Sequence, residues 1–188
     1  FPTSARLLLA GYAFASCAYS LYFKRLLFLD VMTLATFYTV RVLFGGIISD
    51  ITVSVWAQAF FIFLFLSLAM AKRVAELKMT LHLGKEAPAG RCYYVSDLSQ
   101  LQSFGGSSGY IAVLVLALYI QSPEVRIQYA HPEFLWAICL LLLYWIGRLW
   151  ILINRGFLPD DPIAFAARDR ASIGVFAACV LVIAFAKL

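Results

Sequence analysis

Charged side chains are scarce in this 188-residue sequence. Only 13% of its residues are Asp, Glu, Lys or Arg, whereas 63% are hydrophobic and the mean hydropathy is +0.88. A water-soluble domain of this length needs far more polar surface. The scarcity of charge therefore excludes a soluble module and predicts a single-domain, all-α integral membrane protein.

Motifs of several common chemistries are also missing. His82 and His131 stand alone in expected loops, and no P-loop, GxGxxG or Ser-His-Asp order occurs. The four cysteines have no metal-ligand spacing, so free or buried thiols are expected rather than zinc ligands or disulfides. Nothing suggests nucleic acid binding. The chain opens on Phe1-Pro2 without a signal peptide, and we expect a fragment or a processed product.

Long apolar runs are abundant, and a run of about 20 residues spans the hydrocarbon of a bilayer as a helix. The runs predict six membrane helices, of which the fourth is short unless a flanking segment extends it. The predicted helices cover Arg6–Phe23, Leu27–Ile48, Val53–Glu76, Gly109–Gln121, Pro132–Asn154 and Pro162–Ala186.

Positive charge is concentrated on alternate connections between these helices, at about residues 24–27, 77–108 and 155–170. Under the positive-inside rule these connections are cytoplasmic, and both chain ends lie outside. The opposite connections hold only Arg126. Eleven of the 15 basic residues belong to the predicted cytoplasmic side, namely Lys24, Arg25, Lys72, Arg73, Lys78, Lys85, Arg91, Arg148, Arg155, Arg168 and Arg170.

Acidic residues accompany these cations, which favours an enzyme working at the cytoplasmic face. The acids are Glu76, Asp97, Asp160, Asp161 and Asp169. A transporter should also carry polar residues at mid-membrane depth, often in broken helices. The apolar runs here are nearly unbroken, so a transporter is the weaker alternative.

The end of the first predicted helix reads "AYSLYFKR" and carries a candidate phosphate site. Tyr19 and Tyr22 lie one turn apart and precede Lys24. One interpretation is an aromatic belt with snorkelling cations. The other is a phenol and an ammonium group that bind a phosphate.

The second predicted helix carries Asp30, Tyr38 and Arg41 on nearly one face. Asp30 is placed to cap the helix start. Arg41 lies inside an apolar run, where an unpaired charge costs at least a few kcal/mol. We therefore expect Arg41 to face a functional cavity, with a bond to backbone carbonyls as the alternative.

The stretch "SLAMAKRVAEL" ends the third predicted helix with Lys72, Arg73 and Glu76. Both cations can meet Glu76, because residues three and four apart share a helix face. By itself the motif is typical of the charged collar where a helix leaves the bilayer. The alternative is a site for a charged substrate.

The connection that follows contains "GRCYY" and "VSDLSQLQSFGG". Arg91, beside two tyrosines, is a candidate phosphate ligand, with loop packing as the alternative. The second segment predicts a short amphipathic helix with Asp97 as its N-cap and Gly105-Gly106 as its end. Such a helix would lie at the membrane interface or cover a cavity.

The last predicted cytoplasmic connection reads "RGFLPDDPIAFAARDRAS". Asp161 before Pro162 is typical of an N-cap followed by proline at the first helical position. That reading leaves Asp160, Asp169 and the nearby cations, including Arg148, unexplained. Mixed carboxylates and cations suit Mg²⁺ together with a polyphosphate, so Asp160 and Asp161 are weak metal candidates.

The sequence resembles the UbiA superfamily of intramembrane prenyltransferases, and more narrowly its decaprenyl-phosphate phosphoribosyltransferase-like branch. The resemblance runs over nearly the whole chain. It rests on the ordered blocks "YSLYFKRLLFLDVMTLATFYTVRVLFGG", "SLAMAKRVAEL", "GRCYYVSDL", "SGYIAVLVLALYI" and "DDPIAFAARDRAS".

The resemblance implies a bundle of nine transmembrane helices, of which this chain would supply the last six. The family's Asp-rich NDxxD-type motif, which binds Mg²⁺ and diphosphate, is not in the sequence, so most metal ligands would come from sequence outside it. Lys72, Arg73 and Glu76 occupy the place of the second polar motif, instead of the DxxxD of the aromatic prenyltransferases. Tyr19 and Lys24 fall at the family's Tyr/Lys phosphate motif, although their spacing here is five residues.

The resemblance thus implies a transferase of the bacterial inner membrane that moves 5-phosphoribose from phosphoribosyl diphosphate to a polyprenyl phosphate with Mg²⁺. Lys72, Arg73 and Glu76 are the predicted catalytic residues. The predicted substrate ligands are Tyr19, Lys24, Asp30, Tyr38, Arg41, Arg91 and Arg148. Expected partners are the prenyl lipid, the phosphorylated sugar donor and membrane lipids, with homo-oligomers open. The alternatives are prenyl transfer from a diphosphate to a small acceptor, and a non-catalytic membrane subunit or transporter.

Overall fold

The computed structural model describes residues 3–51, 53–157 and 161–188, and these residues form helices and connections without a strand. The long helices are α1 (Thr3–Leu21), α2 (Leu29–Ile48), α3 (Val55–His82), α4 (Leu98–Ile120), α6 (Trp136–Asn154) and α8 (Arg170–Lys187). Shorter elements are α5 (Pro123–Gln128), α7 (Pro162–Arg168) and the 3-10 turns η1 (Phe23–Arg25), η2 (Val95–Asp97) and η3 (Pro132–Leu135).

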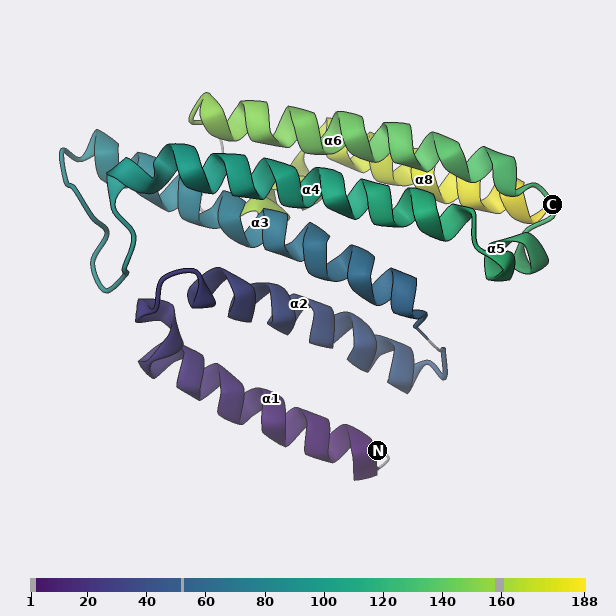
Figure 1. Ribbon diagram of the computed structural model, residues 1–188, viewed down its shortest axis with the longest axis horizontal. Helices are drawn as coiled ribbons and strands as arrows, with labels where there is room; N and C mark the ends of the chain where they lie inside the picture. Colours follow the sequence, from purple (N-terminus) through teal and green to yellow (C-terminus); the bar gives the residue numbers. More distant parts are fainter. Residues whose placement is uncertain (1–2, 52, 158–160) are drawn as a thin grey trace.

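The long helices lie side by side, and successive long helices run in opposite directions (Figure 1). Packing is most extensive between α3 and α4, and α2 covers another side of α3. The α1–α2 and α3–α4 connections and the end of α6 lie at the same end of the bundle, which we call the polar end. The predicted alternation of connections is therefore confirmed for the described residues.

Five helices of the described part are long and apolar enough to cross a membrane. They cover Leu29–Ile48, Val55–His82, Val95–Ile120, Pro132–Asn154 and Arg170–Lys187. The prediction of an all-α membrane protein is thus supported, but the prediction of six spans holds for five. The segment predicted as Arg6–Phe23 does form a helix, α1, yet it is not among the five, because serines, tyrosines and an arginine interrupt its apolar residues.

The predicted helix break at Gly105-Gly106 is wrong, because both glycines lie inside α4. The separate amphipathic helix and the short fourth span are one continuous helix. The reason is packing: a side chain at Gly105 would clash with the Trp150 ring, and a Cβ at Gly109 would lie 2.7 Å from Ile146 Cγ2. These glycines let α4 approach its neighbours closely, as small residues do between membrane helices.

Two predicted helix ends also differ from the structure. The third helix continues past Glu76 to His82, so Glu76 stands inside a helix rather than at its end. The helix predicted over Pro162–Ala186 is divided into α7 and α8 at Asp169, whose backbone is extended. The Asp169 side chain accepts the Ser172 N–H at 2.8 Å and so begins α8 as an N-cap.

Candidate functional site

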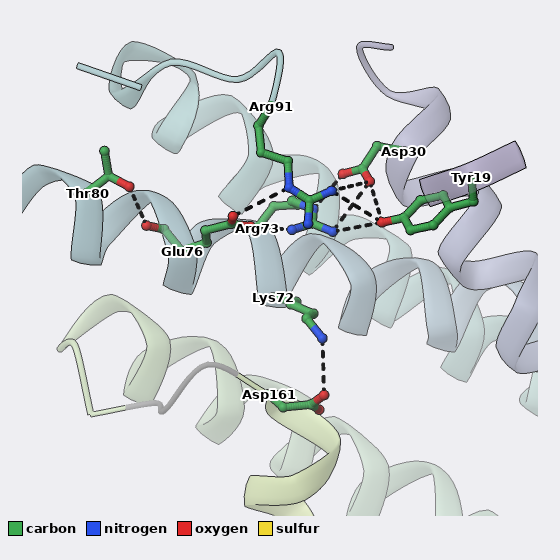
Figure 2. Close-up of polar contacts among 8 residues, drawn as sticks. All are labelled: Tyr19, Asp30, Lys72, Arg73, Glu76, Thr80, Arg91 and Asp161. Carbon is green, nitrogen blue, oxygen red and sulfur yellow. Dashed lines mark hydrogen bonds and ion pairs between the residues drawn. The ribbon is translucent and has the colours of Figure 1, made fainter. Parts of the chain in front are cut away.

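Five polar residues from four segments meet at the polar end of the bundle (Figure 2). We call Tyr19, Asp30, Arg73, Glu76 and Arg91 the arginine–carboxylate cluster. Tyr19 comes from α1, Asp30 from the first turn of α2, and Arg73 and Glu76 from α3. Arg91 reaches in from the α3–α4 connection. All five were predicted site residues, and the structure brings them together.

The centre of the cluster is a buried ion pair between Arg73 and Asp30. Arg73 Nε donates to Asp30 Oδ2 at 2.5 Å, and the two side chains are 3% and 0% exposed. Arg73 Nη2 reaches Tyr19 Oη at 3.1 Å, and Nη1 donates to Glu76. Every guanidinium nitrogen of Arg73 is thus engaged. The alternative of Asp30 as a helix cap is not realised, because the start of α2 has no side-chain cap bond.

Tyr19 and Arg91 complete the network, and Arg91 Nη1 lies 3.4 Å from the Tyr19 hydroxyl. The Tyr19 hydroxyl donates to Asp30 Oδ1 at 2.7 Å. Arg91 Nη1 donates to the same oxygen at 3.2 Å, and Arg91 Nε lies 3.4 Å from Glu76 Oε1. Arg91 and Glu76 are 19% and 33% exposed, so together they form the solvent-facing edge of the cluster. Two guanidinium groups and two carboxylates make the cluster formally neutral.

Tyr93 stabilises the turn at Phe28 that precedes Asp30. This role was not predicted from the sequence. The Tyr93 side chain is buried, and its hydroxyl accepts the Phe28 N–H at 3.2 Å. Phe28 has φ +65°, a conformation uncommon for a bulky residue, immediately before α2 begins. Burial raises the pKa of the Tyr93 phenol. The buried Tyr93 phenol stabilises the turn at Phe28 and so helps to orient the Asp30 carboxylate in the first turn of α2.

Lys72 points away from the cluster, although it neighbours Arg73 in sequence (Figure 2). Lys72 Nζ donates to Asp161 Oδ2 at 3.2 Å, with both side chains about one-third exposed. Glu76 therefore contacts Arg73 and Arg91, and no bond joins it to Lys72 among the described residues. Helix spacing alone would let either cation meet Glu76. The partners on other segments separate the two, because Lys72 pairs with Asp161 whereas Arg73 pairs with Asp30.

The predicted N-cap role of Asp161 is confirmed. Its Oδ1 accepts the Ile163 N–H at 2.9 Å and the Ala164 N–H at 3.3 Å. Burial opposes ionisation of this carboxyl, but hydrogen bonds from the Ile163 N–H and from Lys72 lower its pKa overall. Asp161 thus begins α7 and ties it to α3. Asp160, the other weak metal candidate, lies outside the described residues.

Another ion pair joins α6 to the junction of α7 and α8. Arg148 Nη1 and Nη2 donate to the two carboxylate oxygens of Asp169 at 2.6 and 3.0 Å. Asp169 also accepts the Ser172 hydroxyl at 2.8 Å, and Ser172 accepts the Trp145 indole N–H. The bidentate Arg148 lowers the pKa of Asp169 to about 2. This contact gives Arg148 and Asp169 a structural role, and the predicted substrate contact of Arg148 stays a prediction.

Arg41 and Tyr38 form a group apart from the cluster. Arg41 donates to the Tyr12 hydroxyl at 2.7 and 3.0 Å and lies over the rings of Tyr12 and Tyr38. The observed partners of Arg41 are therefore the two tyrosines, rather than the backbone carbonyls of the alternative interpretation. Arg41 follows Asp30 by 11 residues, or about 16 Å along α2, which separates it from the cluster. The functional cavity expected around it stays a prediction.

Two further predictions concern Lys24 and the metal. Lys24 lies in η1 and is half-buried, without a hydrogen bond or ion pair to another described residue. The described residues contain no group of three His, Cys, Asp or Glu that fits a metal ion. The carboxylates of the cluster are occupied by arginines. The expected Mg²⁺ therefore stays a prediction.

The arrangement can bind an anion at its edge without exposing its centre. Arg91 has donor capacity left, because Nη2 has no hydrogen-bond partner among the described residues. A guanidinium presents a planar fork that matches phosphate oxygens. Glu76 and Asp30 orient that fork, while Arg73 is enclosed. The chemistry available is charge stabilisation and positioning of a phosphorylated group.

Fold and site together define an all-helical, membrane-embedded class of protein with a buried arginine–carboxylate cluster at one end of its bundle. No protein-family model matches the chain. It is 32% identical over 176 residues to an uncharacterized protein, y4nM, of Sinorhizobium fredii. It is 35% identical over 146 residues to nodulation protein NoeC of Azorhizobium caulinodans.

The matches cover 92% and 77% of this chain but 34% and 47% of the two relatives. The chain thus spans between about a third and a half of the length of these relatives. Neither name states a reaction.

Proposed function

We propose that the chain is part of a UbiA-type membrane transferase that acts on a polyprenyl phosphate. The observation that carries the proposal is the arginine–carboxylate cluster, which unites four segments at the polar end. Charged side chains are costly to bury in a membrane protein. A cluster of such charges from several segments is therefore typical of a functional site. The six long helices correspond in this proposal to the last six of a nine-helix bundle.

The proposed reaction transfers 5-phosphoribose from phosphoribosyl diphosphate to the lipid. An oxygen of the lipid phosphate attacks the ribose C1 and forms the new C–O bond. The bond from C1 to the diphosphate breaks, and its electron pair leaves with pyrophosphate. Catalysis is electrostatic and positional, because cations stabilise the departing charge and hold the two reactants in line.

The geometry divides the predicted catalytic residues into two roles. Arg73 is enclosed and each of its guanidinium nitrogens already has a partner, so we assign it to positioning the cluster. Arg91 and Lys72 are partly exposed, so we assign phosphate contact to them. Glu76 orients Arg91 through its second carboxylate oxygen. Mg²⁺ would supply charge neutralisation of the diphosphate from ligands outside the described residues.

Sidedness and partners follow from the same proposal. The polar end faces the cytoplasm of a bacterial inner membrane, because its connections carry most of the basic residues. The water-soluble donor then enters from the cytoplasm, and the prenyl chain leaves laterally between helices. Prenyl transfer to a small acceptor is the alternative, and the absence of a DxxxD at residues 72–76 disfavours it.

The test is turnover by the full-length protein in detergent or nanodiscs. Two donor–acceptor pairs are compared: phosphoribosyl diphosphate with decaprenyl phosphate, and polyprenyl diphosphate with an aromatic acid. Lys72→Ala and Glu76→Gln should each lower turnover of the first pair by about 10²-fold or more, the effect of removing one preorganised charge-stabilising group. Folding is checked by the thermal unfolding midpoint.

Lys85→Ala is the matched control, because Lys85 is an exposed cation of the same α3–α4 connection. It should leave turnover unchanged. Near-normal turnover in both Lys72→Ala and Glu76→Gln would refute the assigned site. Turnover of the second pair alone would favour the prenyltransferase, and turnover of neither pair would favour a non-catalytic membrane subunit.

A further inference from the structure

Two adjoining cavities lie on the α4–α6 side of the molecule, apart from the cluster. One has a volume of about 340 Å³ and is bordered by the cationic or basic side chains Lys78, His82 and Arg155. The other has a volume of about 320 Å³ and continues the first, since Gln102 and Asn154 line both. Both volumes fall in the range of small-molecule sites. We call the pair the α4–α6 groove.

Helical register makes the groove continuous from the polar end into the apolar part of the bundle. On α4 it is lined at Gln102, Gly106 and Tyr110, which are four residues apart and share one face. On α6 the matching positions are Asn154, Ile151, Trp150 and Gly147. Eight residues of helix correspond to about 12 Å along the axis. One end of the groove is therefore cationic and the remainder is mostly apolar.

The groove is separate from the arginine–carboxylate cluster. Lys78 and His82 follow Arg73 on α3 by five and nine residues, so they point about 140° and 180° away from it. Lys78 Nζ instead donates to the main-chain carbonyl of Asn154 and, at 3.2 Å, to its side-chain oxygen. Gln102 Nε2 donates to the same side-chain oxygen at 3.3 Å. The ammonium group is thus held at the mouth of the groove.

Glycines leave space along the floor of the groove. A Cβ at Gly106 would meet nothing within 4 Å, and one at Gly147 would meet only the Tyr110 hydroxyl at 3.8 Å. Gly105, one residue away, is packed against Trp150 and Met70. Tyr110 and Ile151, on either side of the floor, are 52% and 54% exposed on helices apolar enough to span the membrane. The open floor therefore faces the lipid.

We propose that the α4–α6 groove binds an anionic phospholipid from the surrounding bilayer. Its phosphate lies at Lys78 and Arg155, and one acyl chain follows Gly106 and Gly147 toward Tyr110. The charge of the mouth selects an anionic headgroup, because basic side chains near a membrane surface attract anionic lipids. The apolar continuation selects a lipid over a free phosphate, because only a lipid fills both cavities. This site is independent of the proposed transferase activity.

The test uses the full-length protein in nanodiscs with phosphatidylglycerol that carries a diazirine on one acyl chain. After irradiation, crosslinked residues are mapped by mass spectrometry. We expect crosslinks at Tyr110 and Ile151 that unlabelled phosphatidylglycerol displaces several-fold better than phosphatidylcholine. Lys78→Gln combined with Arg155→Gln should lower this labelling several-fold, and Lys85→Gln, outside the groove, should not.

A second variant separates the lipid site from a folding effect. Gly106→Leu fills the groove where the backbone has room, so the protein should fold and lose labelling while the cationic mouth stays intact. Equal displacement by phosphatidylcholine, or labelling retained in both the double variant and Gly106→Leu, would overturn the proposal.

Discussion

At the scale of single residues, the buried Arg73–Asp30 pair decides the stability of the polar end. Removing one partner of a buried ion pair costs about 3–5 kcal/mol when the other charge is left without compensation. Arg73 keeps its contact with Glu76, so Asp30→Asn should lower the free energy of unfolding by about 3 kcal/mol or less, measured by denaturation in mixed micelles. Asp50→Asn is the matched control, because Asp50 is exposed at the other end of α2. Equal losses in the two variants would contradict a buried, compensated pair.

The members of the cluster were predictable from sequence because charge is rare in this chain. Asp30 stood out at a predicted helix start, and Arg73 and Glu76 stood out at a predicted helix end and through the family resemblance. The argument that a charge in an apolar run requires a partner applied to Arg41, which lies apart from the cluster. The partners of the cluster residues were not predictable, because these depend on how the helices rotate against each other. Lys72 and Arg73 are neighbours in sequence, yet one pairs with Asp161 and the other with Asp30. Tyr93 was missed because its hydroxyl acts on a backbone N–H, which has no signature in sequence.

At the scale of helices, Asp169 joins α7 to α8 and ties this junction to α6 through Arg148. Arg148 and Ser172 lower its pKa to about 2, below the ordinary value of about 3.9. A depressed pKa in the folded state contributes stability above the unfolded pKa, and this contribution is lost as the pH falls from about 4 through about 2. The thermal unfolding midpoint of the protein should therefore fall over this interval.

Asp169→Asn tests this pH dependence. The variant should be less stable than the parent at pH 6, and its unfolding midpoint should change less between pH 4 and pH 2. Asp97→Asn is the comparison, because Asp97 accepts one backbone N–H and has no ion pair among the described residues. An unchanged pH dependence in Asp169→Asn would show that another group controls acid stability.

The limits of helix prediction have physical causes in this chain. Apolar runs located the helices because the bilayer length fixes how many residues a span requires. Glycines misled the prediction of helix ends, because Gly105 and Gly109 serve interhelical contact rather than termination. The helix break at Asp169 was also not evident from the sequence, because an acidic residue alone does not end a helix. Asp169 ends α7 and begins α8 through its contacts with Arg148 and with the Ser172 N–H.

At the scale of the whole molecule, the separation of charge between the two ends predicts how the chain sits in a membrane. The α3–α4 connection and the α2–α3 connection lie at opposite ends of the bundle (Figure 1). Basic residues gather at the first, so the positive-inside rule predicts that this end faces the cytoplasm. Lys85 and Asp50 are exposed markers of the two ends.

A single cysteine at each marker tests this orientation in a full-length protein whose native cysteines are replaced. In intact spheroplasts an impermeant maleimide should label Asp50→Cys and spare Lys85→Cys, and inverted membrane vesicles should give the reverse pattern. Permeabilised membranes, in which both react, control for local reactivity. Labelling of both positions from one side would contradict a membrane-spanning α3. Reversed labelling would place the arginine–carboxylate cluster outside, where the proposed cytoplasmic donor does not reach it.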